Sequence, residues 1–386
     1  MKNLETLIRE LCPDGVEFVK LGDVLDYEQP TKYIVKCKDY QNEGMPVLTA
    51  GQTFILGYTD ETNGIFVASK ENPVIIFDDF TTSFHWVDFN FKVKSSAMKM
   101  LRVSSEREVS FRFVYYAMKC IKYQTLEHSR QWISKYSQIE IPLPPIEVQT
   151  EIVRILDKFT SLEAELEAEL DCRKRQYEYY RDKLLSFENV EGQEVEWKKL
   201  NDIVIFKNGK GHEKSIVDEG KYIIVNSKFV STNGMVRKYS DVQLCPLYKD
   251  SILMVMSDLP NGRALAKCFL VDKDDLYTLN QRVGSFVVND NKVVVKFLFY
   301  ILNRNRQLLQ YDNGVDQTNL RKSDILNILI PIPSLAEQHR IVSILDRFES
   351  MTTSLQSGLP AEITARRQQY EHYRDKLLTF KRKGVA

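Results

Sequence analysis

Three short segments contain residue types that enzymes use for chemistry, but each lacks part of the pattern that its chemistry needs. GKGHEKS (residues 209–215) resembles a phosphate-binding loop without the glycine that precedes the lysine. PDGVEFVK (residues 13–20) has the acids and the lysine of a nuclease core at the wrong interval, and IPLPPI (residues 141–146) shares only prolines with the tetrad of amino-methyltransferases. No Gly-x-Gly-x-x-Gly follows a strand pattern. We therefore expect no catalytic residue and no bound cofactor in this chain.

The histidines and cysteines are too far apart in the sequence to indicate a metal site. Zinc-binding motifs bring their ligands together at short intervals, and neither residue type does so here. The residues are His85, His128, His212, His339 and His372, with Cys12, Cys37, Cys120, Cys172, Cys245 and Cys268. We expect no metal, reduced thiols, and histidines at the surface or in local hydrogen bonds.

Polar and basic side chains are concentrated in the turns between apolar segments, where they suit contacts with nucleic acid. Arg, Lys, Asn, Gln, Ser and Thr read base edges, and Lys and Arg also bind phosphates. In the first half of the chain the candidate DNA contacts are Thr81, Thr82, His85, Lys92, Lys94, Ser95, Ser96, Lys99, Arg130, Gln131 and Lys135. In the second half they are Lys207, Asn208, Lys210, Asn226, Ser227, Lys228, Asn261, Arg263, Asn280, Gln281, Arg282, Gln317, Asn319 and Arg321. For any one of them, an ordinary solvated side chain is the alternative.

The net charge is zero, with 53 basic and 53 acidic residues, which on its own argues against binding to DNA. The distribution is uneven, however. Residues 92–135 contain ten Lys or Arg against three Glu, whereas residues 162–171 contain four Glu and one Asp and no basic residue. Positive charge is therefore local, as a DNA-facing surface requires.

Length and hydropathy bound the class of protein. At ~150 residues per domain, 386 residues predict two or three domains. No apolar run approaches the ~20 residues of a membrane-spanning helix, and MKNLETLIREL at the N-terminus lacks the core of a signal peptide. We expect a cytoplasmic protein.

Two segments of the chain occur twice. IPLPPIEVQTEIVRILDKF (residues 141–159) returns as IPIPSLAEQHRIVSILDRF (residues 330–348). RKRQYEYYRDKLLSF (residues 173–187) returns as RRQQYEHYRDKLLTF (residues 366–380). The chain is therefore an internal repeat in which a variable region and a shared segment alternate twice.

Both shared segments have the apolar spacing of long helices, at intervals of three, four or seven residues. Ser334 with Glu337 forms a capping box, and Pro145 suits a first helical position. Gly358 and Pro360 predict an interruption of the second helix that the first helix lacks.

A helix over residues 146–187 would be ~60 Å long, which is too long for one small domain to cover. The second repeat offers a matching apolar stripe. Two copies of a unit are most simply related by a pseudo-two-fold axis, so we expect the helices to lie antiparallel with the variable regions at opposite ends. The alternative is an antiparallel coiled coil that has no role in spacing.

The variable regions have the pattern of short strands and turns. NPVIIFDDF in the first region and SILMVMSDL in the second are examples of β-branched and aromatic runs bounded by turn residues. Each region also has a short helical segment, so we expect two α+β domains. Residues 25–140 and 204–329 show no similarity that can be aligned by eye. Two domains that differ in sequence but are carried on near-identical arms suit the recognition of two different short DNA sequences, called half-words here. The alternative is drift without a function after a duplication.

The repeated arms resemble the central and C-terminal conserved regions of Type I restriction-modification specificity subunits. The resemblance implies an α+β fold with two target-recognition domains separated by two long antiparallel helices, a coiled-coil-like spacer within a pseudo-two-fold repeat. The implied boundaries are 1–141 for the first target-recognition domain, 142–190 for the central helical region, 191–329 for the second domain and 330–386 for the C-terminal helical region.

The resemblance also implies a non-catalytic subunit that binds a bipartite, asymmetric target in double-stranded DNA. Two modification subunits would bind S-adenosylmethionine, flip out adenine and methylate its N6 atom. Restriction subunits would add ATP-driven and magnesium-dependent translocation and cleavage. Candidate partner contacts are the polar points Gln149, Arg154, Gln338 and Arg340 on the apolar arms, and ordinary exposed helix residues are the alternative.

The tetrapeptide Leu-Glu-Ala-Glu occurs twice in succession, at residues 162–165 and 166–169. Four helical residues add ~6 Å, which is close to two base pairs at ~3.4 Å each. Deleting one copy should therefore shorten the non-specific gap of the DNA target and leave both half-words unchanged. The alternative is that the glutamates only solvate an exposed helix face.

Two other functions compete with this interpretation. A coiled-coil adaptor with two protein-binding domains would bind no DNA, and it leaves the basic residues 92–135 unexplained. A recognition module fused to its own methyltransferase would bind S-adenosylmethionine, and the sequence has no methyl-donor motif.

Overall fold

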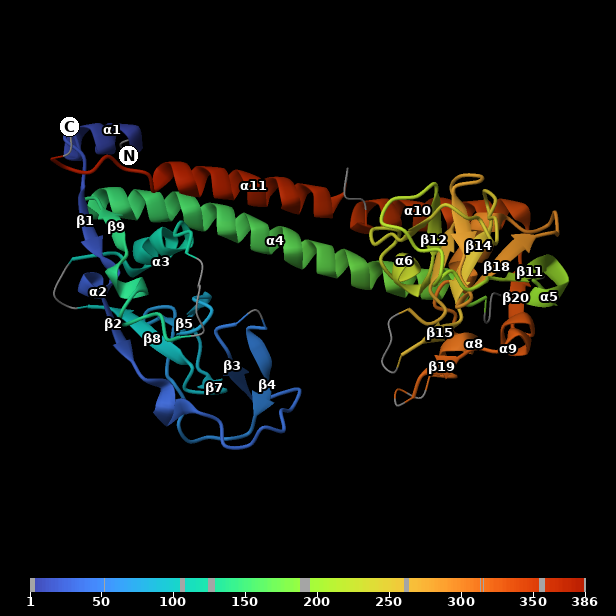
Figure 1. Cartoon of the computed structure of the whole chain (residues 1–386), viewed down its shortest axis with the longest axis horizontal. Coiled ribbons are helices and arrows are strands. Elements are labelled where there is room, and N and C mark those ends of the chain that lie inside the picture. The colour runs from blue at the N-terminus through green and yellow to red at the C-terminus, as the bar shows by residue number, and fades with distance from the viewer. Residues whose placement is uncertain are drawn as a thin grey trace. The chain divides into compact units, whose positions relative to one another are not determined.

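The computed structural model describes residues 4–51, 53–104, 108–123, 129–187, 195–259, 264–312, 314, 316–353 and 358–384. The chain divides into two compact units, one formed by Met1–Ala168 with Glu362–Ala386 and the other by Glu169–Ala361. Each unit combines β-sheets with helices (Figure 1), so the fold is α+β, as the sequence predicts. Among the described residues, no helix is both long and apolar enough to cross a membrane.

The first unit has short strands and short helices ahead of a long helix. Its strands are β1 (Glu17–Lys20), β2 (Leu25–Glu28), β3 (Met45–Leu48), β4 (Ile55–Thr59), β5 (Val74–Asp78), β6 (Phe84–Val87), β7 (Lys92–Val93), β8 (Met98–Val103) and β9 (Glu140–Leu143). Its short helices are α1 (Leu4–Leu11), α2 (Leu21–Val24), η1 (Pro30–Tyr33), α3 (Phe111–Lys119) and η2 (Tyr136–Gln138). The strands form sheets in the orders β2-β8-β5-β6, β4-β3-β7 and β1-β9.

The second unit is built in the same way. Its strands are β10 (Glu196–Lys199), β11 (Val204–Asn208), β12 (Tyr222–Val225), β13 (Tyr239–Ser240), β14 (Ile252–Val255), β15 (Ser257–Asp258), β16 (Cys268–Leu270), β17 (Tyr277–Leu279), β18 (Val283–Val288), β19 (Thr318–Asn319) and β20 (Leu329–Ile332). Its short helices are α5 (Leu200–Ile203), α6 (Ser227–Ser231), α7 (Val295–Leu302), α8 (Arg306–Leu309) and α9 (Lys322–Leu326). The strands form sheets in the orders β11-β18-β14-β16, β13-β12-β17, β10-β20 and β15-β19.

The two units share one sheet plan although their variable regions cannot be aligned by eye. The four-stranded sheet β2-β8-β5-β6 corresponds to β11-β18-β14-β16, and the ribbon β1-β9 corresponds to β10-β20. Both three-stranded sheets contain one parallel pair, β3 with β7 and β12 with β17. Residues 25–140 and 204–329 therefore differ in sequence and agree in architecture.

A helix packs on the four-stranded sheet in each unit and completes the core. In the first unit, Ile75 and Phe77 of β5 and Leu101 of β8 pack with Phe113 and Val114 of α3. The continuous apolar run of β5 fits a strand that is buried on both faces, where alternation is lost. The same arrangement recurs between β14, β18 and α7.

The shared segments form long helices, as the sequence predicts. The first is α4 (Ile146–Leu185), a single helix of 40 residues. The second is interrupted, because α10 (Leu335–Thr353) ends before Gly358 and α11 (Leu359–Leu377) starts after it, with Pro360 in its first turn. A proline is tolerated in that turn because the backbone N–H that it lacks has no partner there in an ordinary helix.

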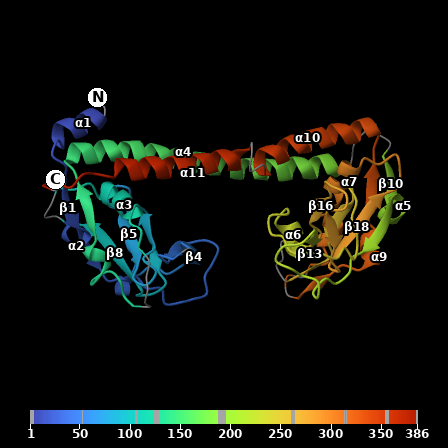
Figure 2. The same cartoon turned by 45° about the horizontal axis from the view of Figure 1, so that its top comes forward.

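The same aromatic contact joins helices in both units. In the first unit Phe159 of α4 stacks on Tyr373 of α11 with ring centres 5.5 Å apart, and in the second Tyr180 of α4 stacks on Phe348 of α10 at 5.7 Å. Phe159 and Phe348 occupy equivalent places in the repeat, as do Tyr373 and Tyr180. In the first unit α11 runs beside α4 in both views (Figures 1 and 2). The predicted two-fold relation between the units stays a prediction.

The C-terminal tail completes the first unit by joining its N-terminal segment. The N–H of Val16 donates to the carbonyl of Lys381 (2.9 Å), and the N–H of Lys383 donates to the carbonyl of Val16 (2.9 Å). Arg382 pairs with Glu140 of β9 (2.5 Å) and its guanidinium lies 4.5 Å from the ring centre of Phe18 of β1. The last residues of the chain therefore belong to the unit that contains the first.

Candidate nucleic-acid interface

Three segments that carry predicted DNA contacts meet at one buried residue of the first unit, Asp79. It begins the turn after β5, and its N–H donates to the carbonyl of Ala97 in the loop before β8 (3.1 Å). Its carboxylate accepts the N–H of Gln131 (3.2 Å) and of Trp132 (2.9 Å), which follow α3. The turn, the loop and residues 129–135 are thereby brought together.

The exposed candidates of the first unit lie on these three segments. Thr81 on the turn, Lys94 and Ser96 on the loop, and Arg130 and Lys135 after α3 are exposed, and Ser95 is half-buried. These side chains combine three hydroxyls for base edges or phosphates with three positive charges. The structure therefore brings together the three segments that carry this part of the predicted set.

Four predicted contacts of the first unit are buried and make their contacts inside the domain, so this structure does not support their assignment to DNA. Lys99 has no exposed surface and pairs with Asp79, and Lys92 pairs with Glu61 (3.1 Å) and donates to the carbonyl of Asn63 (2.6 Å). Gln131 is fully buried and accepts a hydrogen bond from the hydroxyl of Tyr123 (2.9 Å). Thr82 is 9% exposed and donates to the carbonyl of Thr81 (2.7 Å). A buried charge needs a partner, so both lysines act inside the domain.

His85 holds a neighbouring loop. Its Nε2 lies 2.9 Å from the carbonyl oxygen of Gly51, and its ring stacks on Phe54 with centres 4.6 Å apart. Burial lowers the pKa of His85 below its usual value, against the opposing effect of the hydrogen bond to Gly51. The imidazole is thus a structural group of the first unit.

In the second unit, three predicted groups converge at the ends of β11, β12 and β17. Because β12 and β17 are parallel, with Val225 opposite Leu279, the residues that follow them lie at one edge of the sheet. The N–H of Asn280 donates to the carbonyl of Val225 (3.1 Å), and the backbone of Lys210 forms an isolated parallel β-bridge with Asn280. The groups brought together are Lys207, Asn208 and Lys210, then Asn226, Ser227 and Lys228, then Asn280, Gln281 and Arg282.

A buried histidine fastens the basic loop of this group. His212 is 1% exposed; its Nδ1 lies 2.8 Å from the carbonyl oxygen of Lys210 and its Nε2 lies 2.9 Å from Oγ1 of Thr278 on β17. A carbonyl can only accept, so Nδ1 donates to Lys210, and Nε2 shares a second hydrogen bond with the hydroxyl of Thr278. Residues 209–215, which resemble an incomplete phosphate-binding loop in sequence, are thus a turn that His212 attaches to β17.

The remaining candidates of the second unit form a separate group. Gln317 donates to the hydroxyl of Ser257 (2.9 Å), Asn319 pairs with Ser257 across β15 and β19, and Arg321 precedes α9. Arg321 is exposed, and its N–H donates to the carboxylate of Asp324 (3.2 Å). Asn261 and Arg263 lie outside the described residues.

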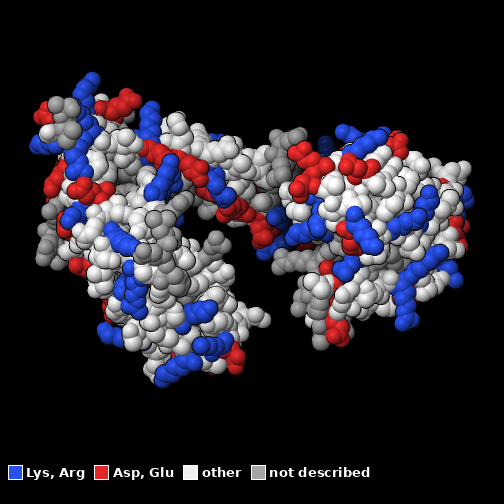
Figure 3. Space-filling view, in the orientation of Figure 1, with Lys and Arg blue, Asp and Glu red and all other residues white. Residues whose placement is uncertain are grey.

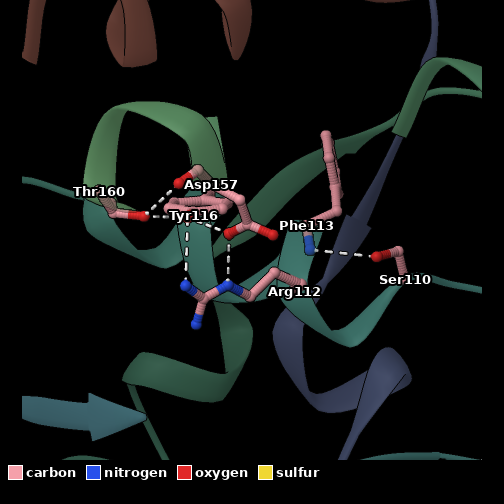
Figure 4. Close-up of polar contacts among 6 residues, drawn as sticks. All are labelled: Ser110, Arg112, Phe113, Tyr116, Asp157 and Thr160. Carbon is pink, nitrogen blue, oxygen red and sulfur yellow. Dashed lines mark hydrogen bonds and ion pairs between the residues drawn. The ribbon is translucent and has the colours of Figure 1, made fainter. Parts of the chain in front are cut away.

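A polar cluster in the first unit joins the short helix α3 to the long helix α4 (Figure 4). On α3, Arg112 donates from Nε to Asp157 of α4 (2.8 Å), and the hydroxyl of Tyr116 donates to the same carboxylate (2.5 Å). Thr160, one turn further along α4, lies 3.4 Å from that hydroxyl, and Ser110 caps α3 by accepting the N–H of Phe113 (3.3 Å). Burial, and next the hydrogen bond to Asp157, raise the pKa of Tyr116 far above its usual value. The hydroxyl therefore remains a donor.

The second unit repeats this cluster with different charges. The hydroxyl of Tyr300 on α7 lies 2.6 Å from Asp346 and 2.8 Å from Glu349, both on α10. Lys296 pairs with Asp346 (2.9 Å) where the first unit has Arg112 with Asp157. The two units thus attach a short helix to a long one through the same Tyr–carboxylate contact.

Comparison with known proteins identifies the family. The family model described as "Type I restriction modification DNA specificity domain" matches residues 13–171 and 193–365. The specificity subunit of the Type I restriction enzyme EcoR124I/EcoR124II of Escherichia coli is 42% identical over 409 residues, covering 98% of this chain and 97% of that one. The chain belongs to the Type I specificity-subunit family. Its function is accordingly the recognition of a DNA target in a Type I restriction-modification system.

Other relatives agree with this assignment. A putative Type I specificity subunit of Haemophilus influenzae is 27% identical over 98% of this specificity subunit and the whole of its own length. The crystal structure of an S subunit from M. genitalium has a TM-score of 0.53 at 17% identity, and covers 94% of this chain and 96% of that chain. At that identity the structural match supports the fold.

Two of the predicted partner contacts of this specificity subunit are buried and make internal hydrogen bonds, so this structure does not support their assignment to a partner. Gln149 is 1% exposed; its Oε1 accepts the N–H of Ser110 (2.9 Å) and its Nε2 donates to the carbonyl of Pro144 (2.7 Å). Gln338, with no exposed surface, makes the equivalent bonds to Val294 (2.8 Å) and Pro333 (2.9 Å). Each glutamine ties the first turn of a long helix to the start of a short one.

The other two partner candidates remain at the surface. About half of the Arg154 and Arg340 side chains is exposed, and each pairs with a glutamate one turn earlier, Glu151 and Glu337. On the face in Figure 3, acidic side chains lie along the middle of α4, while basic side chains recur over the first reading domain of the specificity subunit. This distribution suits a DNA-facing domain attached to a helix that does not face DNA.

Proposed function

We propose that this specificity subunit reads a bipartite, asymmetric DNA target, with one half-word read by the variable domain of each unit. In this proposal the long helices act as a spacer between the two domains, and the gap between the half-words follows their length. The chain itself performs no catalysis.

The observation that carries the proposal is one architecture with two different reading surfaces. The sheet order, the buried glutamine and the Tyr–carboxylate contact recur in both units. The polar side chains gathered beyond the sheets do not recur, because the first unit offers Thr81, Lys94 and Arg130 while the second offers Lys210, Asn280 and Arg282. Direct readout depends on the identity and placement of such side chains, so different sets read different words.

Partner subunits would supply the chemistry and the cofactors. Two modification subunits would bind S-adenosylmethionine and methylate adenine at N6 after flipping it from the duplex. Restriction subunits would bind ATP and magnesium to translocate and cleave DNA. Arg154 and Arg340, exposed at the starts of α4 and α10, remain candidate contacts for these partners, and a cytoplasmic location stays a prediction.

The test is single-molecule sequencing for N6-methyladenine in DNA from cells that express this chain with its modification subunit. We expect a split, asymmetric motif that disappears when the chain is deleted. An active and assembled complex that leaves no such motif would contradict the proposal and favour a protein adaptor. Binding of S-adenosylmethionine by the isolated chain would instead favour a fused methyltransferase.

A further inference from the structure

We propose that the buried ion pair of Asp79 with Lys99 is a positioning device for DNA reading, and that it sets the accuracy with which the first domain reads its half-word. The inference rests on the proposed function and concerns residues that do not themselves touch DNA. Asp79 and Lys99 are positioning residues. The side chains that they place are Thr81, Ser96 and Arg130.

The pair is enclosed by the first domain. Lys99 has no exposed surface and Asp79 is 1% exposed, and the ammonium nitrogen lies 3.4 Å from Oδ2 of the carboxylate. The ammonium also lies 5.0 Å from the ring centre of Tyr27 on β2. Within the described part of the chain this nitrogen has no hydrogen-bond partner, so the carboxylate is its main compensation.

The other oxygen of Asp79 does the positioning. Its Oδ1 accepts the N–H of Trp132 (2.9 Å) and shares the N–H of Gln131 with the backbone carbonyl of Asp79. These two amides lie immediately after Arg130, which is exposed. The carboxylate therefore fixes where the segment with Arg130 leaves the core, and Thr81 lies two residues after Asp79 in the turn that Asp79 begins.

The strand registers give the equivalent place in the second domain. Phe77 pairs with Lys99 between β5 and β8, and Met254 pairs with Gly284 between β14 and β18. On the neighbouring strands, Tyr27 of β2 pairs with Leu101 of β8, and Phe206 of β11 pairs with Phe286 of β18. Lys99 therefore corresponds to Gly284.

The same registers match Asp79 with Met256 and Tyr27 with Phe206. A Cβ atom on Gly284 would lie 2.9 Å from the sulfur of Met256 and 2.7 Å from the ring of Phe206, so this place is tightly filled by apolar atoms. One sheet plan thus accepts either an ion pair or an apolar contact here.

This comparison separates folding from positioning. Burying two charges carries a large desolvation cost before their attraction is counted, and an apolar replacement of similar volume is often neutral or stabilising. Since the second domain folds around the apolar version, the fold does not require the charges. The side chain of Met256, unlike the carboxylate of Asp79, cannot hold the following segment by accepting its backbone N–H groups. In the second domain the N–H of the equivalent residue, Leu320, donates to the backbone carbonyl of Met256 (2.8 Å).

Two double variants isolate the acceptor from the charge. Asp79→Leu with Lys99→Met removes the ion pair and the acceptor, and leaves no unpaired charge. Asp79→Asn with Lys99→Gln also removes both charges, but the asparagine oxygen still accepts the two N–H groups and its amide can donate to the glutamine. Both are compared with the wild type as assembled complexes with the modification subunit.

The readout is the methylated motif in cellular DNA, scored base by base in both half-words, together with thermal unfolding. We expect the Leu/Met variant to fold but to unfold a few degrees below the wild type, because the buried N–H of Trp132 loses its acceptor. It should methylate sites with a mismatch in one half-word about tenfold more readily, which is part of the discrimination that a mismatched base pair normally carries. Discrimination in the other half-word should be unchanged. The Asn/Gln variant should keep both words at wild-type accuracy.

Three results would overturn the proposal: the Leu/Met variant keeps both words, it relaxes both words equally, or the Asn/Gln variant relaxes the same word to the same degree. If the Leu/Met variant fails to fold, Arg130→Ala carries the test, because it must relax one word without changing stability. A wild-type complex that yields no split motif would instead refute the proposed function, and this inference with it.

Discussion

The two units attach their reading domains to the long helices in the same way and fill their reading surfaces differently. Gln149 and Gln338 bond to the same backbone groups of equivalent helices, and each unit then joins a tyrosine to a carboxylate. Beyond the sheets the agreement ends, because a buried ion pair orders the first surface and His212 orders part of the second. The features that recur hold a domain on its helix, and under the proposed function the features that differ would determine which sequence each domain reads.

The two helical arms also differ, and the largest predicted effect is a change in the length of the continuous arm, α4. The first arm is continuous, whereas the second is interrupted between α10 and α11. Deleting residues 162–165 from α4 should shorten the gap in the DNA target by about one to two base pairs, because four helical residues span ~6 Å. Since Leu-Glu-Ala-Glu repeats at once, Glu167 takes the place of Glu163 and the facing contacts are kept. Methylome sequencing reports the gap directly.

The matched control keeps the length of α4 and removes its charge, by Glu163→Gln with Glu165→Gln. The gap should then equal that of the wild type, and both half-words should be unchanged in either variant. An unaltered gap after the deletion would leave the glutamates as a solvated helix face and refute the spacer.

The glutamine junctions give the next largest effect. Gln149→Leu leaves the N–H of Ser110 and the carbonyl of Pro144 buried without partners, at a cost of about 3 kcal/mol in unfolding free energy. Gln338→Leu should cost more, since Gln338 also donates to the carbonyl of Lys292 (2.7 Å). Hydrogen exchange at the first turns of α3 and α7 measures each unit separately. If the first variant loosens α7 as much as α3, the two junctions are not independent.

Arg154→Ala and Arg340→Ala are the controls for these variants. Their side chains are about half exposed, so unfolding free energy should change by less than about 0.5 kcal/mol. The same variants test the partner surface, since loss of the modification subunit without loss of stability would place it at these arginines.

The features of this molecule that the sequence could predict are those that depend on neighbouring residues. Helix periodicity, the capping residues and the Gly358–Pro360 interruption act within a few residues, so the arms follow from the sequence. The shared sheet plan could not be found that way, because pairings such as Ile75 with Leu101 join distant segments whose side chains have changed. Burial depends on such pairings as well.

Lys94 and Lys99 show this limit in the predicted site. Both are lysines in a basic segment, yet Lys94 is exposed and Lys99 is enclosed. The local sequence pointed the other way, because Lys99 between Met98 and Met100 has the apolar–polar alternation of a strand with one face in solvent, whereas Met98 to Leu101 are all buried. Asp79 and His212, which order the two surfaces, were missed because their partners lie far away in the chain.

The tyrosine contacts sharpen the comparison at a smaller scale. Tyr116→Phe removes a hydrogen bond to one carboxylate and should cost about 2 kcal/mol. Tyr300→Phe should cost more, because it leaves Asp346 and Glu349 facing each other without the hydroxyl that lies between them. Exchange of Glu349→Thr, which copies Thr160 of the first unit, should bring the cost of Tyr300→Phe down to that of Tyr116→Phe. If Tyr300→Phe and Tyr116→Phe lower the unfolding free energy equally without Glu349→Thr, the carboxylate of Glu349 does not contribute to the difference.

The smallest effect concerns a contact that only one unit can make. Arg367 of α11 pairs with Glu163 (2.7 Å) and Glu167 (3.2 Å) of α4, and its side chain is 53% exposed. The equivalent residues of the second unit are Lys174 and Thr352, which cannot form an ion pair. Arg367→Ala should lower unfolding free energy by at most about 1 kcal/mol, and by less in 1 M salt, because exposed pairs are screened. Lys174→Ala is the control and should have no salt-dependent cost. A loss at Arg367 that persists in high salt would mean that its aliphatic stem, and not its charge, holds the two helices.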